Sequence, residues 1–286
     1  MSMDVRDLMA RAMIGFDEDE DWSSENETGL AAIARLHALA SREVLDAALA
    51  ACSDAEPLRR RVGAAVIGQL GHSRVGYEPV FAEERYEALA DLLAAERVGA
   101  EDPGVFSEAC VAFGHLGDPR AIPALLELRE HPEASVRFGV AFGLFGHKMS
   151  EAIDGLIALS SDCDEAVRDW ATFGLGQMTD ADNPTIRAAL HARLDDPCFE
   201  ARNEAIEGLA SRGDLSVLPA LIRELQSGVA LPLLDAAIAL GRTELCESLI
   251  ATAASGLIVQ ARYGPYDLTD SWAEAMRACG CRKHES

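Results

Sequence analysis

The residues best suited to chemistry by type and spacing lie near the C-terminus, where Cys279-Gly280-Cys281 is followed by His284. Two thiolates and one imidazole are zinc ligands, but a structural zinc site takes four ligands. This segment supplies at most three. We therefore predict no metal site, and nothing else in the sequence indicates a cofactor.

Motifs of the common catalytic sites are absent from the sequence. It contains no GxxxxGK(S/T) or GxGxxG phosphate loop and no HExxH, GxSxG or CxxC motif. Three histidines, His72, His115 and His147, each follow a glycine directly. In a repeat array they could gather along one edge, but they occupy different positions within their repeats. We therefore interpret them as surface loop residues. We expect a protein without enzymatic activity.

The formal net charge is −23, from 48 acidic and 25 basic residues. Such a surface repels nucleic-acid phosphates and anionic membranes, so we expect neither as a partner. A protein partner with a basic face is the natural complement. The same charge would also serve solubility alone, and the sequence leaves that alternative open.

One group of aromatic and acidic residues has the composition of a protein-binding site. Phe138 and Phe142 are four residues apart, and Trp170 and Phe173 are three apart, so each pair shares a face if its segment is helical. Around them we place four acidic residues, which are Glu108, Asp169, Glu204 and Glu207. Aromatic anchors with a polar rim are typical of binding hot spots. The alternative is that the aromatic residues pack between helices as core.

The elements that must position these residues repeat along the chain. Five helix-like segments share a pattern of small and apolar residues that is centred on Ala112, Gly143, Gly174, Gly208 and Ala239. These centres are 31, 31, 34 and 31 residues apart, and a weaker copy covers residues 60–68. A fixed period in this range is the signature of a solenoid. Glycine costs about 1 kcal/mol inside a helix, so its recurrence at one register indicates close helix contacts.

Each copy is followed by a second segment with apolar residues at three- and four-residue spacing, the pattern of an amphipathic helix. These segments are 121–131, 151–161, 185–194, 216–225 and 243–252. Helix starts are marked by Asp102, Asp118 and Asp196, each followed by proline, and by Asn183 and Asp214. Helix pairs of this length bury their apolar stripes only by stacking, so we predict an all-α solenoid.

The pattern V-R-x-x-A-x-x-(A/G)-L-G, clearest at residues 167–176 and begun at Val136-Arg137, resembles the short HEAT repeats of the phycobilisome-lyase-like class. The resemblance covers residues 58–254, and the whole chain resembles HEAT-repeat proteins of actinobacteria. It implies a right-handed α–α superhelix of HEAT-type helix pairs, with the V-R-x-x-A helices lining the concave face. The family's arginine is replaced by Phe106 and Leu233, as expected for atypical terminal repeats.

On the V-R-x-x-A helices the valine, the alanine and the small residue form the buried stripe. Positions one, two and five after the arginine should therefore face the concave groove. In the three repeats that carry the arginine in this region, these positions are Phe138, Gly139 and Phe142, then Asp169, Trp170 and Phe173, and then Asn203, Glu204 and Glu207. We place the protein-binding site on this face.

We divide the chain into three parts. Residues 1–28 carry a dense acidic run with little to bury and are expected to be disordered, although residues 4–14 have the pattern of a short helix. Residues 29–254 form the solenoid. Residues 255–286 break the pattern with a turn and then a capping helix.

The seven cysteines are scattered, odd in number and several lie among apolar helical residues. That distribution favours reduced, buried thiols over a disulfide framework. The N-terminus has acidic residues and no apolar signal core, and no stretch reaches the roughly 20 apolar residues of a membrane span. We expect a cytoplasmic protein.

These observations predict a non-enzymatic protein-binding scaffold or adaptor that uses its concave face for a basic or amphipathic protein partner. An inhibitor or immunity-type role would be a special case. HEAT-like DNA glycosylases hold DNA in a basic groove, and this chain has the opposite charge. The alternative from a different class is a lyase- or chaperone-like subunit related to phycobilin lyases, which rests on fold analogy alone.

Overall fold

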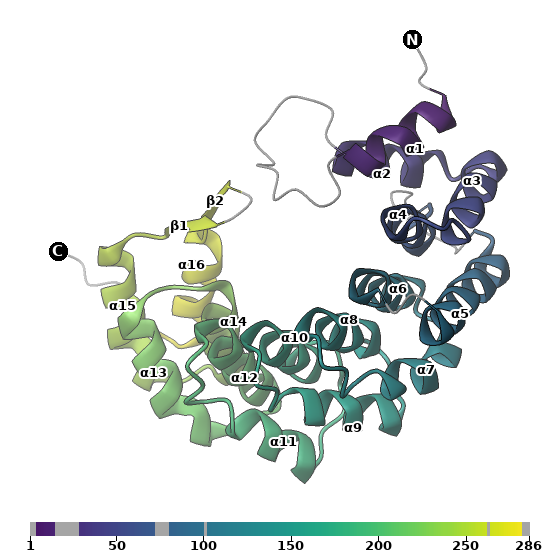
Figure 1. Ribbon diagram of the computed structural model, residues 1–286. Helices are drawn as coiled ribbons and strands as arrows, with labels where there is room; N and C mark the ends of the chain where they lie inside the picture. The colour runs from purple at the N-terminus through teal and green to yellow at the C-terminus, as the bar shows by residue number, and fades with distance from the viewer. Residues whose placement is uncertain (1–3, 15–28, 72–79, 100–101, 262–263, 282–286) are drawn as a thin grey trace. The chain divides into compact units, whose positions relative to one another are not determined.

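The chain folds as an all-α solenoid, as the repeat pattern predicts. The computed structural model describes residues 4–14, 29–71, 80–99, 102–261 and 264–281 (Figure 1). Within these residues the regular structure is helical except for one two-stranded antiparallel sheet. None of the described helices combines the length and apolar character needed to cross a membrane. The chain divides into two compact units, unit 1 (Met1–His147) and unit 2 (Lys148–Ser286).

Unit 1 has two helical layers. The inner layer, α4, α6 and α8, carries the repeated pattern of small residues, and α3, α5 and α7 form the outer layer (Figure 1). The elements are α1 (Val5–Ile14), α2 (Gly29–Leu39), α3 (Arg42–Cys52), α4 (Pro57–Gly68), α5 (Ala82–Val98), α6 (Pro103–Leu116), the 3₁₀ helix η1 (Pro119–Ala121), α7 (Ile122–Glu127) and α8 (Ala134–Leu144).

Unit 2 repeats this plan, with α10, α12, α14 and α16 as the inner layer and α9, α11, α13 and α15 as the outer layer (Figure 1). The helices are α9 (Ser150–Leu159), α10 (Glu165–Gly176), α11 (Pro184–His191), α12 (Phe199–Ser211), η2 (Leu215–Val217), α13 (Leu218–Ser227), α14 (Leu231–Leu240), η3 (Thr243–Leu245), α15 (Cys246–Ser255) and α16 (Thr269–Ala278). Strands β1 (Ile258–Ala261) and β2 (Gly264–Asp267) pair in antiparallel fashion, with Val259 opposite Tyr266.

Most of the predicted helix starts are confirmed. The side chains of Asp102, Asp118, Asn183 and Asp214 each accept a hydrogen bond from a backbone N–H group of the following turn. The assignment of Asp196 was wrong, because α12 begins at Phe199 and its N-cap is Cys198. The Asp196 carboxylate is instead 3.0 Å from the guanidinium of Arg168, in the preceding inner helix.

Glycine brings neighbouring inner helices into backbone contact. A Cβ atom added to Gly208 would lie 2.6 Å from the Cα atom of Gly176. One added to Gly114 would lie 3.1 Å from the Cα atom of Gly143. Cβ atoms do not normally approach other atoms below 3.0 Å, so α12 and α10 in particular depend on the missing side chains. The packing role inferred from the recurrence of glycine is therefore confirmed.

The repeat arginine ties the inner helix that carries it to the loop before that helix. One guanidinium nitrogen of Arg168 donates to the carbonyl oxygens of Asp162 and Cys163, six and five residues earlier in the chain. The same bonds recur at the corresponding arginines, Arg60, Arg137 and Arg202. Ion pairs with acidic residues of neighbouring elements add to these bonds, in the pairs Arg60–Glu96, Arg168–Asp196 and Arg202–Glu224.

The N-terminal segment differs in part from the expected disorder. The helix expected over residues 4–14 is present as α1, which packs against α2 and buries Leu8 and Met9. Residues 15–28, which hold the acidic run, lie outside the described residues. The apolar side of α1 was visible in the sequence, and its burial means that these residues contribute to the core.

The helix expected near the C-terminus is present as α16. Helix α16 packs against α14, and the indole Nε1 of Trp272 donates to the carbonyl oxygen of Leu249. The expectation of reduced thiols was wrong for one pair, since Cys246 and Cys281 form a disulfide. The chain path around α16 brings these two residues together although 35 positions separate them.

We predict that Leu8→Ala lowers the free energy of unfolding by about 2–4 kcal/mol, because Leu8 is only 2% exposed. Thermal unfolding followed by circular dichroism would measure the loss. The matched control is Ile14→Ala in the same helix, where the side chain is 76% exposed and little should change. Equal melting temperatures for the two variants would contradict the docking of α1.

A second prediction concerns the cysteines. Because Cys246 and Cys281 are bonded and the other five are free, alkylation of the denatured, unreduced protein should add five groups. Alkylation after reduction should add seven, which intact-mass spectrometry would resolve. Seven groups without reduction would show that the purified protein lacks the disulfide.

Candidate functional site

The inner layer of unit 2 gathers most of the residues singled out from the sequence. Helix α10 carries Asp169, Trp170 and Phe173, α12 carries Glu204 and Glu207, and α14 adds Asp235. All six side chains are half-buried. We call this set the acidic–aromatic surface, and its members are Asp169, Trp170, Phe173, Glu204, Glu207 and Asp235.

The two aromatic residues of α10 contact each other. Their ring centroids are 5.8 Å apart in an edge-to-face arrangement, as expected for residues one helical turn apart. Because both rings are half-buried, they are neither wholly core nor wholly exposed. They combine packing within the unit with an accessible apolar face.

One amide links the two carboxyl groups of α12 to α10. Gln177, at the C-terminal end of α10, donates a hydrogen bond from its Nε2 to Glu204 and another, of 2.8 Å, to Glu207. The backbone contact between Gly176 and Gly208 holds these helix ends together. Two acidic side chains are thereby fixed beside each other.

The acidic groups of this surface raise one another's pKa values. Burial, followed by the charges of Glu207 and Asp169, raises the pKa of Glu204 to about 8. Burial and the charge of Asp235 raise the pKa of Glu207 to about 7. For Asp169, burial and then the charges of Glu200 and Asp196 raise the pKa to about 6. At neutral pH the surface therefore holds protons that exposed carboxylates would release.

A polar cavity of about 360 Å³ adjoins this surface at the C-terminal ends of α10 and α12. Its lining residues are Gly176, Gln177, Thr179, Asp180, Glu207, Ser211 and Arg212. Arg212 is committed elsewhere, since its guanidinium donates to backbone carbonyls that include those of Gly176 and Gly208. Helix C-termini carry partial negative charge, and the Arg212 guanidinium offsets it at these two helix ends.

The remaining predicted site residues belong to unit 1. Glu108 is half-buried on α6, and burial raises the pKa of its carboxyl group to about 7. Phe138 and Phe142 of α8 are also half-buried, and the ring centroids of Phe142 and Phe145 are 4.5 Å apart. The proximity expected between this pair and the aromatic pair of unit 2 stays a prediction.

Two positions expected on the groove are buried instead. Gly139 packs against α6, where an added Cβ would lie 2.7 Å from the Ser107 carbonyl oxygen. Asn203 is 2% exposed, and its Oδ1 atom has no hydrogen-bond partner among the residues that the structure describes. The position directly after the arginine therefore points between helices in this repeat.

The loop histidines also differ from their interpretation as surface residues. His147 is 9% exposed, and burial lowers the pKa of its imidazole. His115 is half-buried within α6, 3.0 Å from the Gln69 side chain. His72 lies outside the described residues.

Three contributors to the site were missed from the sequence. Asp235 occupies the repeat position of Trp170 and Glu204, four residues before the small residue, so the alignment contained a signal for it, although Leu233 replaces the repeat arginine. Gln177 and Arg212 act through contacts between helix ends, which the repeat pattern does not encode. Within the described residues, no group of three or more His, Cys, Asp or Glu side chains could hold a metal ion.

Comparison with known proteins supports the repeat assignment. Residues 153–241 match the family model described as HEAT repeats, and residues 107–131 match the PBS lyase HEAT-like repeat. Protein YibA of Escherichia coli strain K12 is 31% identical over 179 residues, as is YibA of E. coli O157:H7. The match covers 61% of this chain and 61% of the length of YibA.

The X-ray structure of E. coli YibA gives the same fold over nearly the whole chain. It superposes with a TM-score of 0.61 at 22% identity, covering 99% of this chain and 98% of the other. An identity this low supports the fold and says nothing of function.

The raised pKa values predict how stability depends on pH. The pKa values of Glu204 and Glu207 lie above the ordinary 4.5, so the folded state binds more protons than the unfolded state between about pH 5 and 8. Stability contributed by these groups must fall as pH rises through that window. The double variant Glu204→Gln with Glu207→Gln should therefore raise the free energy of unfolding at pH 8. The expected increase is about 1 kcal/mol, a modest amount because water screens the charges of half-exposed groups. At pH 4.5 the free energy of unfolding should change little.

Urea unfolding at the two pH values measures this difference. The matched control is Asp154→Asn with Glu247→Gln, at exposed sites on the outer helices α9 and α15 of the same unit. A stabilisation by the Glu204 and Glu207 variant that does not change with pH would show that the carboxyl groups ionise normally.

Proposed function

Because the chain is a HEAT-repeat protein of the phycobilisome-lyase-like class, we propose that it is a non-enzymatic scaffold that binds a basic segment of a partner protein. The proposed binding site in unit 2 is the acidic–aromatic surface. Stacked inner helices give a solenoid a continuous face on which an extended partner segment can lie.

The observation that carries the proposal is the row of carboxyl groups with raised pKa values. Burial and neighbouring acidic groups raise the pKa values of Glu204, Glu207 and Asp169, and no basic side chain among the described residues contributes to these shifts. An incoming Lys or Arg side chain would let the carboxyl groups ionise. It would also replace their mutual repulsion with ion pairs.

The aromatic residues favour a peptide over a simple cation. Trp170 and Phe173 offer half-buried ring faces beside Asp169 on the same helix. A guanidinium or ammonium group over such a ring gains about 0.5–2 kcal/mol. The aliphatic stem of Lys or Arg would cover the apolar part of the rings at the same time.

The proposal extends to unit 1 through Glu108, Phe138 and Phe142, which have the same mixture of acidic and aromatic character. Their half-burial leaves part of each side chain accessible. Within unit 1 these residues are proposed to contact a basic partner segment in the same way.

A second candidate is a lyase- or chaperone-like subunit, which the match of residues 107–131 to the PBS lyase HEAT-like repeat favours. Its test is the absorbance of a linear tetrapyrrole incubated with the purified protein. A shifted spectrum that survives gel filtration would support this candidate over the scaffold.

For the scaffold, we predict that a labelled peptide of alternating Lys and Gly binds the wild-type protein and that Glu204→Gln with Glu207→Gln weakens binding at least tenfold. The wild-type affinity should rise between pH 6 and 8.5, as Glu207 and Glu204 lose their protons. It should fall as salt is added, because ions screen the attraction. Fluorescence anisotropy would measure all three effects.

The control for this experiment is again Asp154→Asn with Glu247→Gln, which removes the same charge from the outer layer of unit 2. Equal losses in both variants would mean that the peptide responds only to net charge. That result would argue against a specific site on the inner layer.

A further inference from the structure

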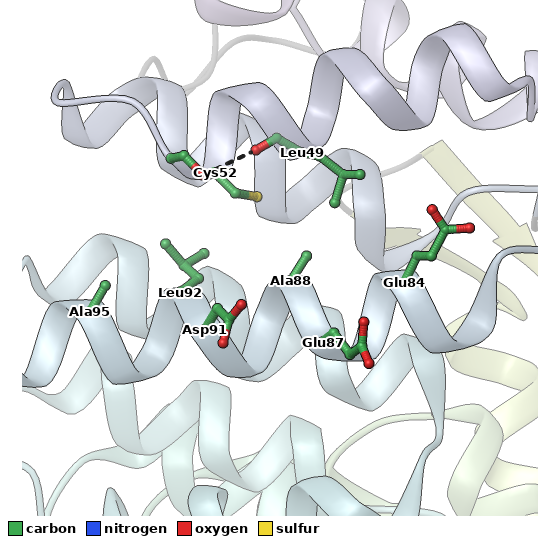
Figure 2. Close-up of a pocket in the computed structure, with 9 residues that line it drawn as sticks. Leu49, Cys52, Glu84, Glu87, Ala88, Asp91, Leu92 and Ala95 are labelled. Atoms are coloured by element: carbon green, nitrogen blue, oxygen red, sulfur yellow. Dashed lines mark hydrogen bonds between the residues drawn. The ribbon is translucent and has the colours of Figure 1, made fainter.

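Unit 1 has an open groove in its outer layer, between α3 and α5. Figure 2 shows its two walls, with Leu49 and Cys52 on α3 facing Ala88, Leu92 and Ala95 on α5. The groove encloses about 550 Å³. We call it the α3–α5 groove, and its other lining residues are Ser53, Glu84, Glu87 and Asp91.

The floor of the groove is apolar. Leu92 is 3% exposed and Cys52 is 7% exposed, while Leu49 and Ala88 are half-buried. Burial raises the pKa of the Cys52 thiol to about 12, so it stays neutral and acts as a small apolar group. The small side chains of Ala88 and Ala95 leave α5 open to close approach.

One edge of the groove is acidic. Glu84, Glu87 and Asp91 lie three and four residues apart on α5, so they follow one helix face over about 10 Å. Figure 2 shows these side chains along that edge. Glu84 is paired with Arg42 at 2.7 Å. Glu87 and Asp91 are exposed and have no ion pair with any described residue, and no Lys or Arg lines the groove.

We infer that the α3–α5 groove is a docking site for a basic amphipathic helix of a partner protein. The apolar side chains of the partner helix enter the floor between Leu49 and Leu92, and the Lys or Arg side chains of that helix pair with Glu87 and Asp91. Charge complementarity identifies this occupant, because the lining contains three carboxylates and no base. The site is in unit 1 and does not depend on the proposed function of unit 2.

The dimensions of the groove favour a helix lying across it. A cavity of about 550 Å³ admits a few large side chains and not a whole helix, so the ligand must rest on the rim. Acidic residues at i, i+3 and i+7 match basic residues at the same spacing on an opposing helix. An anionic membrane surface would be repelled by the same carboxylates.

The test uses the full-length protein and a labelled helical peptide with Leu at i, i+3, i+4 and i+7 and Lys along both flanks. We expect wild-type binding that weakens at least tenfold in Glu87→Lys with Asp91→Lys. Ala88→Gln, which narrows the floor without changing charge, should weaken binding at least fivefold. Anisotropy titrations would measure each dissociation constant, and circular dichroism would confirm that each variant is folded.

Three controls separate this site from general attraction to an acidic protein. Ala94→Gln changes an exposed alanine of the same helix outside the groove, and Asp154→Lys with Glu247→Lys makes the same charge change in unit 2. Glu204→Gln with Glu207→Gln removes the site proposed in unit 2. All three should bind the helical peptide within twofold of wild type.

The inference is overturned if the peptide does not bind the wild-type protein or if a scrambled peptide of equal composition binds equally well. It is also overturned if Ala88→Gln binds like wild type, since the floor would then be unused. Loss of binding in the Glu204 and Glu207 variant alone would assign the peptide to unit 2 and remove the groove as its site.

Discussion

The buried arginine of the V-R repeats is the interaction on which the arrangement of helices depends. Arg168 is 9% exposed, and its guanidinium donates both to carbonyls of its own loop and to Asp196. A buried guanidinium is costly unless its donors are used, so loop, helix and acidic partner are held as one group. Breaking such a pair costs about 3–5 kcal/mol. Each arginine thereby sets the direction in which the residues after it point.

The electrostatics of the acidic–aromatic surface follow from this packing. With the arginines fixing each helix, Gly176 and Gly208 bring α10 and α12 into backbone contact. Side chains next to that contact lose water and gain acidic neighbours, which is why the pKa values of Glu204 and Glu207 are raised. Helices kept apart by larger residues would leave these carboxyl groups solvated. The glycine repeat is therefore a cause of the unusual charge state as well as of the fold.

The sequence predicts what local patterns determine and misses what distant partners determine. Helix periodicity, most caps and the repeat period were correct because each depends on residues a few positions apart. Asp196 has the local pattern of a cap, but Arg168, 28 positions earlier, takes its carboxylate. Asn203 was placed on the surface by helical geometry alone, and the fold leaves it only 2% exposed. The bond between Cys246 and Cys281 depends on the chain path around α16, which cysteine spacing does not reveal.

The helices of unit 1 are closely spaced in the inner layer and more widely spaced in the outer layer. A Cβ atom added to Gly68 would lie 2.8 Å from the Cα atom of Ala112, so the inner helices α4 and α6 are at backbone contact. Their outer neighbours, α3 and α5, leave about 550 Å³ between them. When one layer is drawn together, the other must spread or be filled by large side chains, because helix pairs stack as rigid units. Here α5 presents Ala88 and Ala95 at the gap, which leaves the space open. The small residues that close the inner layer and those that keep the outer layer open thus produce surfaces of different form, both acidic, in one repeat architecture.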